Sequence, residues 1–185
     1  MLCTDFSPFP EIQTERLLLR RMSFDDAEEI LYLRSNDDVM KYIDRERTKS
    51  IEDAKLFLKK IDDSISSNNG IMWGITLKEE PGKLIGNIGY WRLIKEHYRA
   101  EVGYMLHPSF WNKGIMKEAL LRLIDYAFDD MNLHSIEANI NPGNKASAML
   151  LESTGFIKEA YFKEDYFFNG SFHDTIIYSR LKYQT

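Results

Sequence analysis

The spacing of apolar residues along the chain changes between two periods, and the changes mark the predicted elements. Alternating or β-rich stretches at 14–22, 71–78, 83–94 and 98–107 predict four strands, the second and third joined by a turn at "EEPG". From Met116 the period lengthens to 3.6, because one apolar stripe contains Met116, Ala119, Leu120, Leu123, Ile124, Ala127 and Phe128. The stripe predicts a helix with one face packed on the sheet.

The same reasoning places the remaining elements. Helices are predicted at 23–36, where Ser23 is the N-cap, at 50–65, and at 144–154, where Gly155 stops the helix. A strand is predicted at 134–141, and a final strand pair at 156–181 turns at "FNGS". The resulting order, β-α-α-β-β-β-α-β-α-β-β, predicts a mixed α/β fold with a mostly antiparallel sheet. One right-handed parallel β-α-β unit is expected from Tyr98 to Asn141.

Length and composition narrow the class of protein. We expect one domain over residues 1–185, because no repeat, linker or low-complexity tract interrupts the chain. The net charge of -5 argues against nucleic-acid or membrane partners. No apolar run approaches the roughly 18 residues of a membrane span, and the N-terminus does not resemble a secretory signal, so a cytoplasmic location is expected. A single cysteine and four scattered histidines predict neither a disulfide nor a metal site.

The loop "PSFWNKG" carries the first candidate chemistry, because it leads directly into the long helix. The first amides of a helix lack partners and lie at the positive end of its dipole, which favours a bound phosphate. Gly114 permits an unusual φ and a close ligand approach, and Lys113 adds a cation. The alternative is that Gly114 only turns the chain, since neither GxGxxG nor GxxxxGK[ST] occurs.

Several motifs together carry a resemblance to a known family. They are "AEVGYMLHPSFWNKGIMKEAL", "YAF", "NPGNKASAMLLESTGF" and the closing "YFFNGSFHDTIIYSRL", with "ERLLLRRM" and "KLIGNIGY" before them. In this order and spacing they resemble the GNAT superfamily of acetyl-CoA-dependent N-acetyltransferases. More narrowly, the chain is similar to the RimJ/RimL-like branch, named for ribosomal-protein N-terminal acetylation. The resemblance covers nearly the whole chain and implies the GNAT fold, with acetyl-CoA as cosubstrate and no metal.

The resemblance also implies where acetyl-CoA lies. Its pyrophosphate is expected on the backbone amides of Asn112, Lys113, Gly114, Ile115 and Met116. Its pantetheine arm is expected to pair with the main chain of Tyr104, Met105 and Leu106, where the strands at 98–107 and 134–141 splay apart. Asn144 and Ser147 occupy the family's Asn-x-x-Ser positions near the pantetheine and the sulfur; the alternative is a helix cap and a packed small residue.

The chain departs from the general family pattern at two places. The signature Gln or Arg, two residues, Gly, one residue, Gly or Ala is represented by Trp111, Gly114 and Met116. A Trp in the first place is usual for this branch, whereas Met116 is bulkier than Ala. Many GNAT enzymes have a Tyr that protonates the leaving thiolate, and Leu151 occupies that position here. Ser147 is therefore the candidate acid that matches by position.

Two further residues are candidates for acid or base roles in the reaction. Tyr166 is a second, non-matching candidate acid, and Glu101, on the same strand face as Met105, is the candidate base or amine-binding carboxylate. The alternative for Glu101 is an edge or ion-pair residue beside Arg99. We expect direct attack by a primary amine in a ternary complex.

The acceptor itself is left with several alternatives. Because no strong base is apparent, a protein or peptide N-terminus is favoured over a lysine. Small-molecule amines such as polyamines or antibiotics, and a non-catalytic acyl-CoA-binding module, remain as alternatives. The C-terminal edge strands are compatible with a homodimer.

Overall fold

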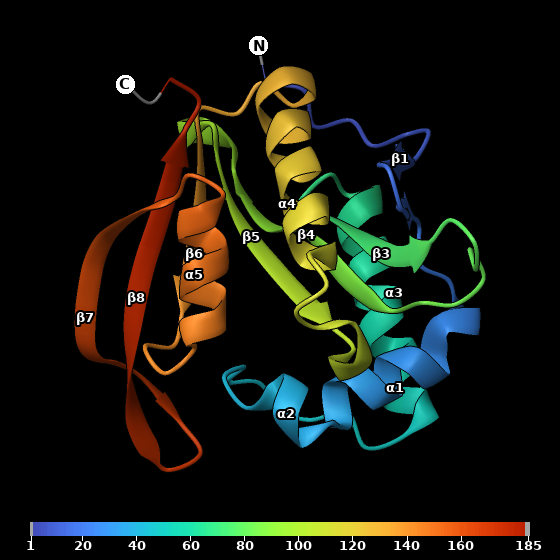
Figure 1. The fold of residues 1–185 in the computed structure, drawn as a ribbon, viewed down its shortest axis with the longest axis horizontal. Helices are drawn as coiled ribbons and strands as arrows, with labels where there is room; N and C mark the ends of the chain where they lie inside the picture. The colour runs from blue at the N-terminus through green and yellow to red at the C-terminus, as the bar shows by residue number, and fades with distance from the viewer. Residues whose placement is uncertain (1, 184–185) are drawn as a thin grey trace.

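One mixed sheet forms the centre of the molecule (Figure 1). The computed structural model describes residues 2–183. The sheet has eight strands in the order β1-β2-β3-β4-β5-β6-β8-β7, and every neighbouring pair is antiparallel except β5 and β6. The strands are β1 (Ile12–Gln13), β2 (Leu17–Arg20), β3 (Ile71–Leu77), β4 (Gly86–Ile94), β5 (Arg99–Leu106), β6 (Ser135–Ile140), β7 (Ile157–Phe168) and β8 (Ser171–Leu181).

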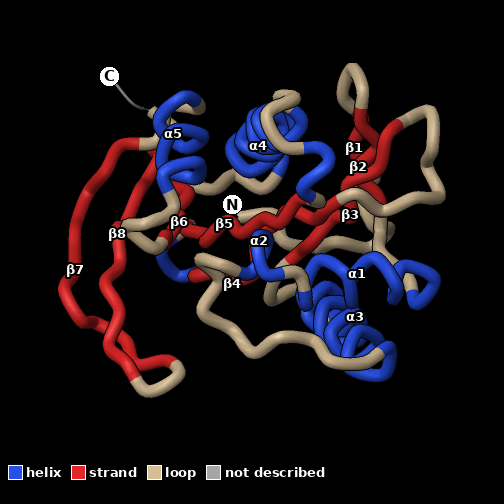
Figure 2. Tube along the Cα trace, turned by 60° about the horizontal axis from the view of Figure 1, so that its bottom comes forward, coloured by secondary structure: helices blue, strands red, loops and turns tan. Residues whose placement is uncertain are grey.

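Helices cover both faces of this sheet. They are α1 (Ala27–Ser35), α2 (Asp37–Met40), α3 (Ile51–Ser66), α4 (Ile115–Asp125), which continues as a π-helical turn, and α5 (Lys145–Ser153). Figure 2 shows α4 and α5 on one side of the sheet and α1 and α3 on the other. None of the helices within residues 2–183 combines the length and apolar character needed to cross a membrane.

The predicted mixed α/β fold and its single parallel pair are confirmed. Two small elements were not predicted, namely β1 and α2. β1 has two residues and α2 a single turn, so neither is long enough to establish a period. α2 is defined instead by its cap, because the Asn36 side chain accepts hydrogen bonds from the amides of Asp38 and Val39.

The predicted apolar stripe of α4 packs on the sheet. All seven residues of the stripe are buried, and most are 0 to 1% exposed. They join one core cluster with Trp73 and Tyr90, two of the largest fully buried side chains. The Tyr90 hydroxyl donates a 2.7 Å hydrogen bond to the carbonyl oxygen of Leu123, so the strand also holds the helix through a buried polar contact. This packing fixes the direction in which α4 begins.

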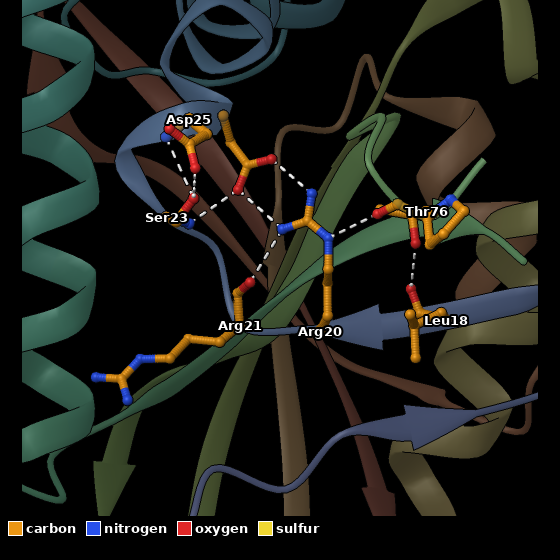
Figure 3. A network of polar contacts seen from close by, with 8 residues as sticks. Leu18, Arg20, Arg21, Ser23, Asp25 and Thr76 are labelled. Atoms are coloured by element: carbon orange, nitrogen blue, oxygen red, sulfur yellow. Dashed lines mark hydrogen bonds and ion pairs between the residues drawn. The ribbon is translucent and has the colours of Figure 1, made fainter.

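An ion pair between a partly buried guanidinium and a buried carboxylate joins the other helical layer to the sheet (Figure 3). Asp26, only 2% exposed, precedes α1 and receives two hydrogen bonds from the guanidinium of Arg20 on β2, at 2.9 and 2.6 Å. The same carboxylate accepts the amide of Ser23 at 2.8 Å, while Arg20 also donates to the carbonyl oxygens of Pro81 and Arg21. Both charges are thus paired and hydrogen-bonded, which burial requires.

We expect Asp26→Asn to destabilise the protein by about 3 kcal/mol, because it leaves the partly buried Arg20 charge without a counter-ion. Urea unfolding at pH 7 measures the loss. Asp62→Asn is the matched control, since Asp62 pairs with the neighbouring Arg21 but its side chain is 50% exposed. The control should lose less than about 1 kcal/mol. Equal losses in the two variants would contradict this account of α1 attachment.

Candidate active site

The parallel strands β5 and β6 pair for only part of their length. Their ladder joins Arg99–Glu101 to Ser135–Glu137, yet β5 continues to Leu106 and β6 to Ile140. We call the unpaired region, residues 102–106 and 138–140, the fork; Figure 1 shows the two strands separating there. On the edge facing β6, the backbone of β5 has no strand partner beyond Glu101. Such an edge can accept an extended ligand.

The loop before α4 lies at the end of β5. The Trp111 indole N–H donates a 2.8 Å hydrogen bond to the carbonyl oxygen of Leu106, which ties the loop to the strand. Asn112 and Gly114 have φ values of 57° and 73°. Gly114 is the N-cap of α4, and no side chain within the described residues caps the helix there. The first amides of α4 are therefore left for a ligand or for water.

The loop is held by Arg16, which was not among the predicted site residues, and we call its contacts with Lys113 and Glu118 the clamp. Arg16, between β1 and β2, donates to the carbonyl oxygen of Lys113 at 2.9 Å and pairs with Glu118 in the first turn of α4 at 2.7 Å. Glu118 also accepts the Thr14 hydroxyl at 2.5 Å and the Arg16 amide at 2.9 Å. Burial works to raise the pKa of Glu118, but these partners outweigh it and lower the pKa. The clamp places a guanidinium beside the loop.

Met116, the bulky departure from the family signature, points away from this loop. Its side chain is buried, at 9% exposure, in the core cluster beneath α4. Leu151, the second departure, is 0% exposed in the same cluster. Both residues that depart from the family pattern are therefore part of the hydrophobic core.

The structure brings three predicted residues together on the α5 side of the fork. The hydroxyl groups of Tyr104 on β5 and Ser147 on α5 are 2.5 Å apart, and Ser147 is only 6% exposed. Asn144 accepts the amide of Ser147 at 3.0 Å, as a helix N-cap. Burial raises the pKa of Tyr104 to about 12, although the hydrogen bond to Ser147 works in the opposite direction. Tyr104 is therefore a neutral phenol at neutral pH.

Glu101 lies in a cluster of four charges at the base of the fork. It is opposite Glu137 in the parallel ladder, and the two residues are 6% and 7% exposed. Arg92 contacts Glu101 at 3.0 Å and Glu137 at 3.4 Å, while Arg99, the expected neighbour of Glu101, pairs with Glu137 instead. The cause is a β-bulge in β4 at Trp91, which places Arg92 directly opposite Glu101.

The balance of effects on Glu101 raises the pKa of its carboxyl. Burial raises the pKa of its carboxyl, and the charge of Glu137 adds to the increase. Arg92 and a hydrogen bond with Asn139 work in the opposite direction without cancelling it. A carboxylate with a raised pKa is a stronger base once it is ionised.

The candidate acid and base occupy opposite faces of the sheet. Side chains alternate along a strand, so Glu101 and Met105 share one face and Tyr104 points to the other. In agreement, Met105 packs against the cluster formed with α1 and α3, whereas Tyr104 packs against the α4 cluster. The fork is the place where both faces can be reached.

Tyr166 lies on β7, in the β7–β8 hairpin. Its hydroxyl donates to the carboxylate of Asp44, in the segment after α2, and its ring stacks on His173 with 5.3 Å between centroids. Burial and the contact with Asp44 raise the pKa of Tyr166. The hairpin is thereby joined to the segment after α2. A catalytic role for Tyr166 stays a prediction.

Other features lie away from the fork. One surface hollow of about 430 Å³ is lined by residues such as Tyr98 and His134, at the opposite end of β5. Another of about 340 Å³ lies between α1 and α3, beside Arg34 and Phe57. Within residues 2–183, no three His, Cys, Asp or Glu side chains form a group that could hold a metal ion. The unpaired strand edge and the helix start remain the features suited to an extended anionic ligand.

Comparison with known proteins identifies the family. Residues 16–157 match the acetyltransferase (GNAT) domain. The chain belongs to this family, and it is an acetyl-CoA-dependent N-acetyltransferase.

Three similar proteins illustrate the range of the family. The chain is 36% identical to the uncharacterized N-acetyltransferase YoaA of Bacillus subtilis over 94% of its own length and 98% of that protein. It is 32% identical to the ribosomal protein uS5 alanine N-acetyltransferase of Escherichia coli, over 51% of this chain and 50% of that one. The crystal structure of spermidine N-acetyltransferase from Vibrio cholerae, bound to CoA and spermine, has a TM-score of 0.79 and 25% identity, covering 91% of this chain and 97% of that one.

The clamp on the loop gives a stability prediction. Glu118→Gln should lower the free energy of unfolding at pH 7 by about 1 kcal/mol, because charge-assisted hydrogen bonds are lost. Since the folded-state pKa of Glu118 is lowered, its contribution is present above the unfolded value near 4.3 and is lost as the pH falls through the folded value. The difference between wild type and variant, measured by thermal unfolding, should therefore shrink in acid.

The matched control is Glu28→Gln, because Glu28 is an exposed carboxylate in the first turn of α1. This variant should change the free energy of unfolding by less than about 0.5 kcal/mol at any pH. If Glu118→Gln changed the free energy of unfolding as little as Glu28→Gln, the clamp would not contribute to stability.

Proposed function

We propose that this enzyme is a single catalytic domain. It transfers acetyl from acetyl-CoA to the α-amine of a protein or peptide N-terminus, of the ribosomal-protein type. The observation that carries the acceptor class is the charge balance at the base of the fork. Two buried carboxylates there, Glu101 and Glu137, face two guanidiniums, those of Arg92 and Arg99. A single amine fits such a balanced site better than a polycation does.

Acetyl-CoA binds, in this proposal, along the fork and the start of α4. The pyrophosphate lies on the amides of residues 112–116, and Lys113 lies close enough to add a positive charge. The pantetheine arm pairs with the free edge of β5 at 104–106, as an added strand would. Asn144 lines the pantetheine with the part of its side chain that does not cap α5. The exposed Gly114, with its φ of 73°, supports this placement.

The chemistry needs a base, an oxyanion donor and a stabiliser of the leaving thiolate. Glu101, through a water molecule, accepts the proton of the amine as nitrogen attacks the thioester carbonyl. A main-chain N–H near Met105 donates to the oxyanion. Ser147 donates to the sulfur as the C–S bond breaks. This arrangement is a direct transfer in a ternary complex, without an acyl-enzyme.

The strength of the base supports an α-amine over a lysine. At pH 7 an α-amine with a pKa near 8 is roughly 10% neutral, whereas a lysine near 10.4 is neutral about once in 2,500. Glu101 is paired with Arg92, which limits its basicity. Such a base is adequate for an amine that is already partly neutral.

A small-molecule amine is the second candidate, because the spermidine enzyme of Vibrio cholerae shares the fold across 91% of this chain. A polyamine site needs carboxylates in excess to hold several ammonium groups. At the base of the fork, Arg92 would repel a second ammonium. Its side chain is 48% exposed, so it is accessible to an acceptor. The charge balance therefore ranks polyamines below N-termini.

Release of the CoA thiol tests the acceptor class. The panel contains a lysine-free peptide with a free N-terminus, an N-acetylated peptide with one lysine, and spermidine. At pH 7 the first should react roughly 200-fold faster in kcat/KM than the second, from amine ionisation alone. At pH 9 this ratio should fall roughly tenfold, since more of the lysine is then neutral.

Three other results would contradict the proposal or favour one of its alternatives. Equal rates on the two peptides would reject the α-amine assignment. Fastest release with spermidine would establish the small-molecule alternative. Acetyl-CoA that raises the Tm without thiol release for any amine would indicate a binding module.

The pH profile tests the role of Glu101. Because its pKa is raised, kcat/KM of the wild type should fall as the pH drops through a value above the ordinary 4.3 of glutamate. Glu101→Gln should remove this acidic limb and lower the rate at pH 7 by about 100-fold. The ionisation of the amine itself should remain in the profile of the variant.

Glu137→Gln is the matched control, because Glu137 occupies the opposite position on the same rung of the ladder. It should keep the acidic limb. If the limb disappeared in Glu137→Gln and survived in Glu101→Gln, Glu137 would be the base.

A further inference from the structure

One side-chain hydrogen bond crosses the fork on its α5 side. The Tyr104 phenol reaches from β5 to the Ser147 hydroxyl on α5, with 2.5 Å between the oxygens. Tyr104 lies three residues beyond the last rung of the parallel ladder, so the bond leaves β5 where this strand has already separated from β6. This contact holds the Ser147 hydroxyl at the free edge of β5.

The position where the family pattern has a tyrosine cannot supply a hydroxyl here. Leu151 has no polar group and is 0% exposed in the core. A serine alone is a weak substitute, because its hydroxyl rotates freely and donates to whichever acceptor is nearest. Ser147 therefore needs a partner that fixes the direction of its proton.

We propose that Tyr104 is a positioning residue for the leaving group, which directs the O–H of Ser147 toward the sulfur of CoA. This inference rests on the proposed function, because it takes the thioester to lie in the fork. It assigns the Tyr104 side chain a task in addition to the main-chain contact with pantetheine.

A neutral phenol is able to donate this hydrogen bond to the serine oxygen. Burial raises the pKa of Tyr104 to about 12, so the phenol keeps its single proton at neutral pH. If the phenol donates that proton to the Ser147 oxygen, the serine proton is left free for another acceptor. The partner of the Ser147 amide is already fixed, since Asn144 accepts it at 3.0 Å. The thiolate is the acceptor that develops during the reaction.

The step balances without an additional reactant. The amine nitrogen forms the C–N bond with the carbonyl carbon, and the C–S electron pair leaves on sulfur. The proton of the amine passes to Glu101 and then to solvent. Sulfur is stabilised by the hydrogen bond from Ser147 and takes a proton from solvent as CoA leaves. Tyr104 and Ser147 keep their protons throughout.

A double-mutant cycle on the full chain tests the proposal. Tyr104→Phe and Ser147→Ala should each lower kcat by about 10- to 100-fold and change KM for acetyl-CoA by less than about threefold. The double variant should lose no more than about threefold beyond the worse single variant, because the two groups act as a unit. A loss of kcat in the double variant equal to the product of the two single losses would overturn the proposal.

The pKa of the CoA thiol bound to the enzyme provides a readout that a purely structural role would not move. Thiolate absorbance in the ultraviolet, followed against pH in the CoA complex, should show this pKa raised by roughly one unit in Tyr104→Phe and equally in Ser147→Ala. Tyr126→Phe is the matched control, because Tyr126 is also partly buried, with a pKa of about 12, but packs against Trp73 on α4's side of the sheet. It should leave the thiol pKa unchanged.

The outcomes separate this inference from the proposed function. An active wild type whose bound thiol pKa stays constant in Tyr104→Phe would overturn the inference alone. Should Tyr104→Phe fold poorly, Ser147→Ala makes the same measurement with the phenol in place, and a constant thiol pKa there is equally decisive. A wild type that releases no thiol with any amine would overturn the proposed function, and this inference with it.

Discussion

The separation of β5 and β6 after three rungs is the constraint on which the rest of the structure depends. Two parallel strands that kept pairing would satisfy their backbone groups and leave no place for an extended ligand. Here the last rung joins Glu101 to Glu137, two buried carboxylates on one face. Like charges on one rung are tolerable only with counter-ions. Arg92 and Arg99 are these counter-ions, so the two carboxylates can lie side by side at the last rung of the β5–β6 ladder.

The fork is held from both faces by elements distant in sequence. On one face the ion cluster draws on β4, β5 and β6; on the other, Tyr104 meets Ser147 across the gap. At the end of β5, Arg16 fixes the loop before α4 from the opposite edge of the sheet. Each contact leaves backbone amides of the fork and of α4 available. Rigid side-chain contacts around free backbone groups describe a preorganised binding site.

Periodicity predicted the elements of this site, but not the partners of its side chains. The stripe from Met116 to Phe128 is local, so spacing alone revealed the helix and its buried face. The Arg16 contact joins residues 102 positions apart, and nothing near Arg16 in the sequence indicates it. Arg99 was the obvious neighbour of Glu101, but the bulge at Trp91 shifts the register and brings Arg92 opposite. Because β4 is buried continuously up to Tyr90 and shows no alternation, its apolar pattern does not reveal the bulge.

At Leu151, where the chain departs from the family pattern, the residue serves packing, and the hydroxyl groups lie at other positions. Helix α5 must bury one face, and Leu151 serves that need at 0% exposure. A tyrosine at this position would have to carry its hydroxyl out of the core or leave it unpaired, which costs about 1 to 3 kcal/mol. Tyr104 approaches from the strand instead, with its ring in the core and its hydroxyl on Ser147. The group that orients a donor can thus come from a different element than the one in the family pattern, and for this reason a missing motif residue does not by itself indicate a missing activity.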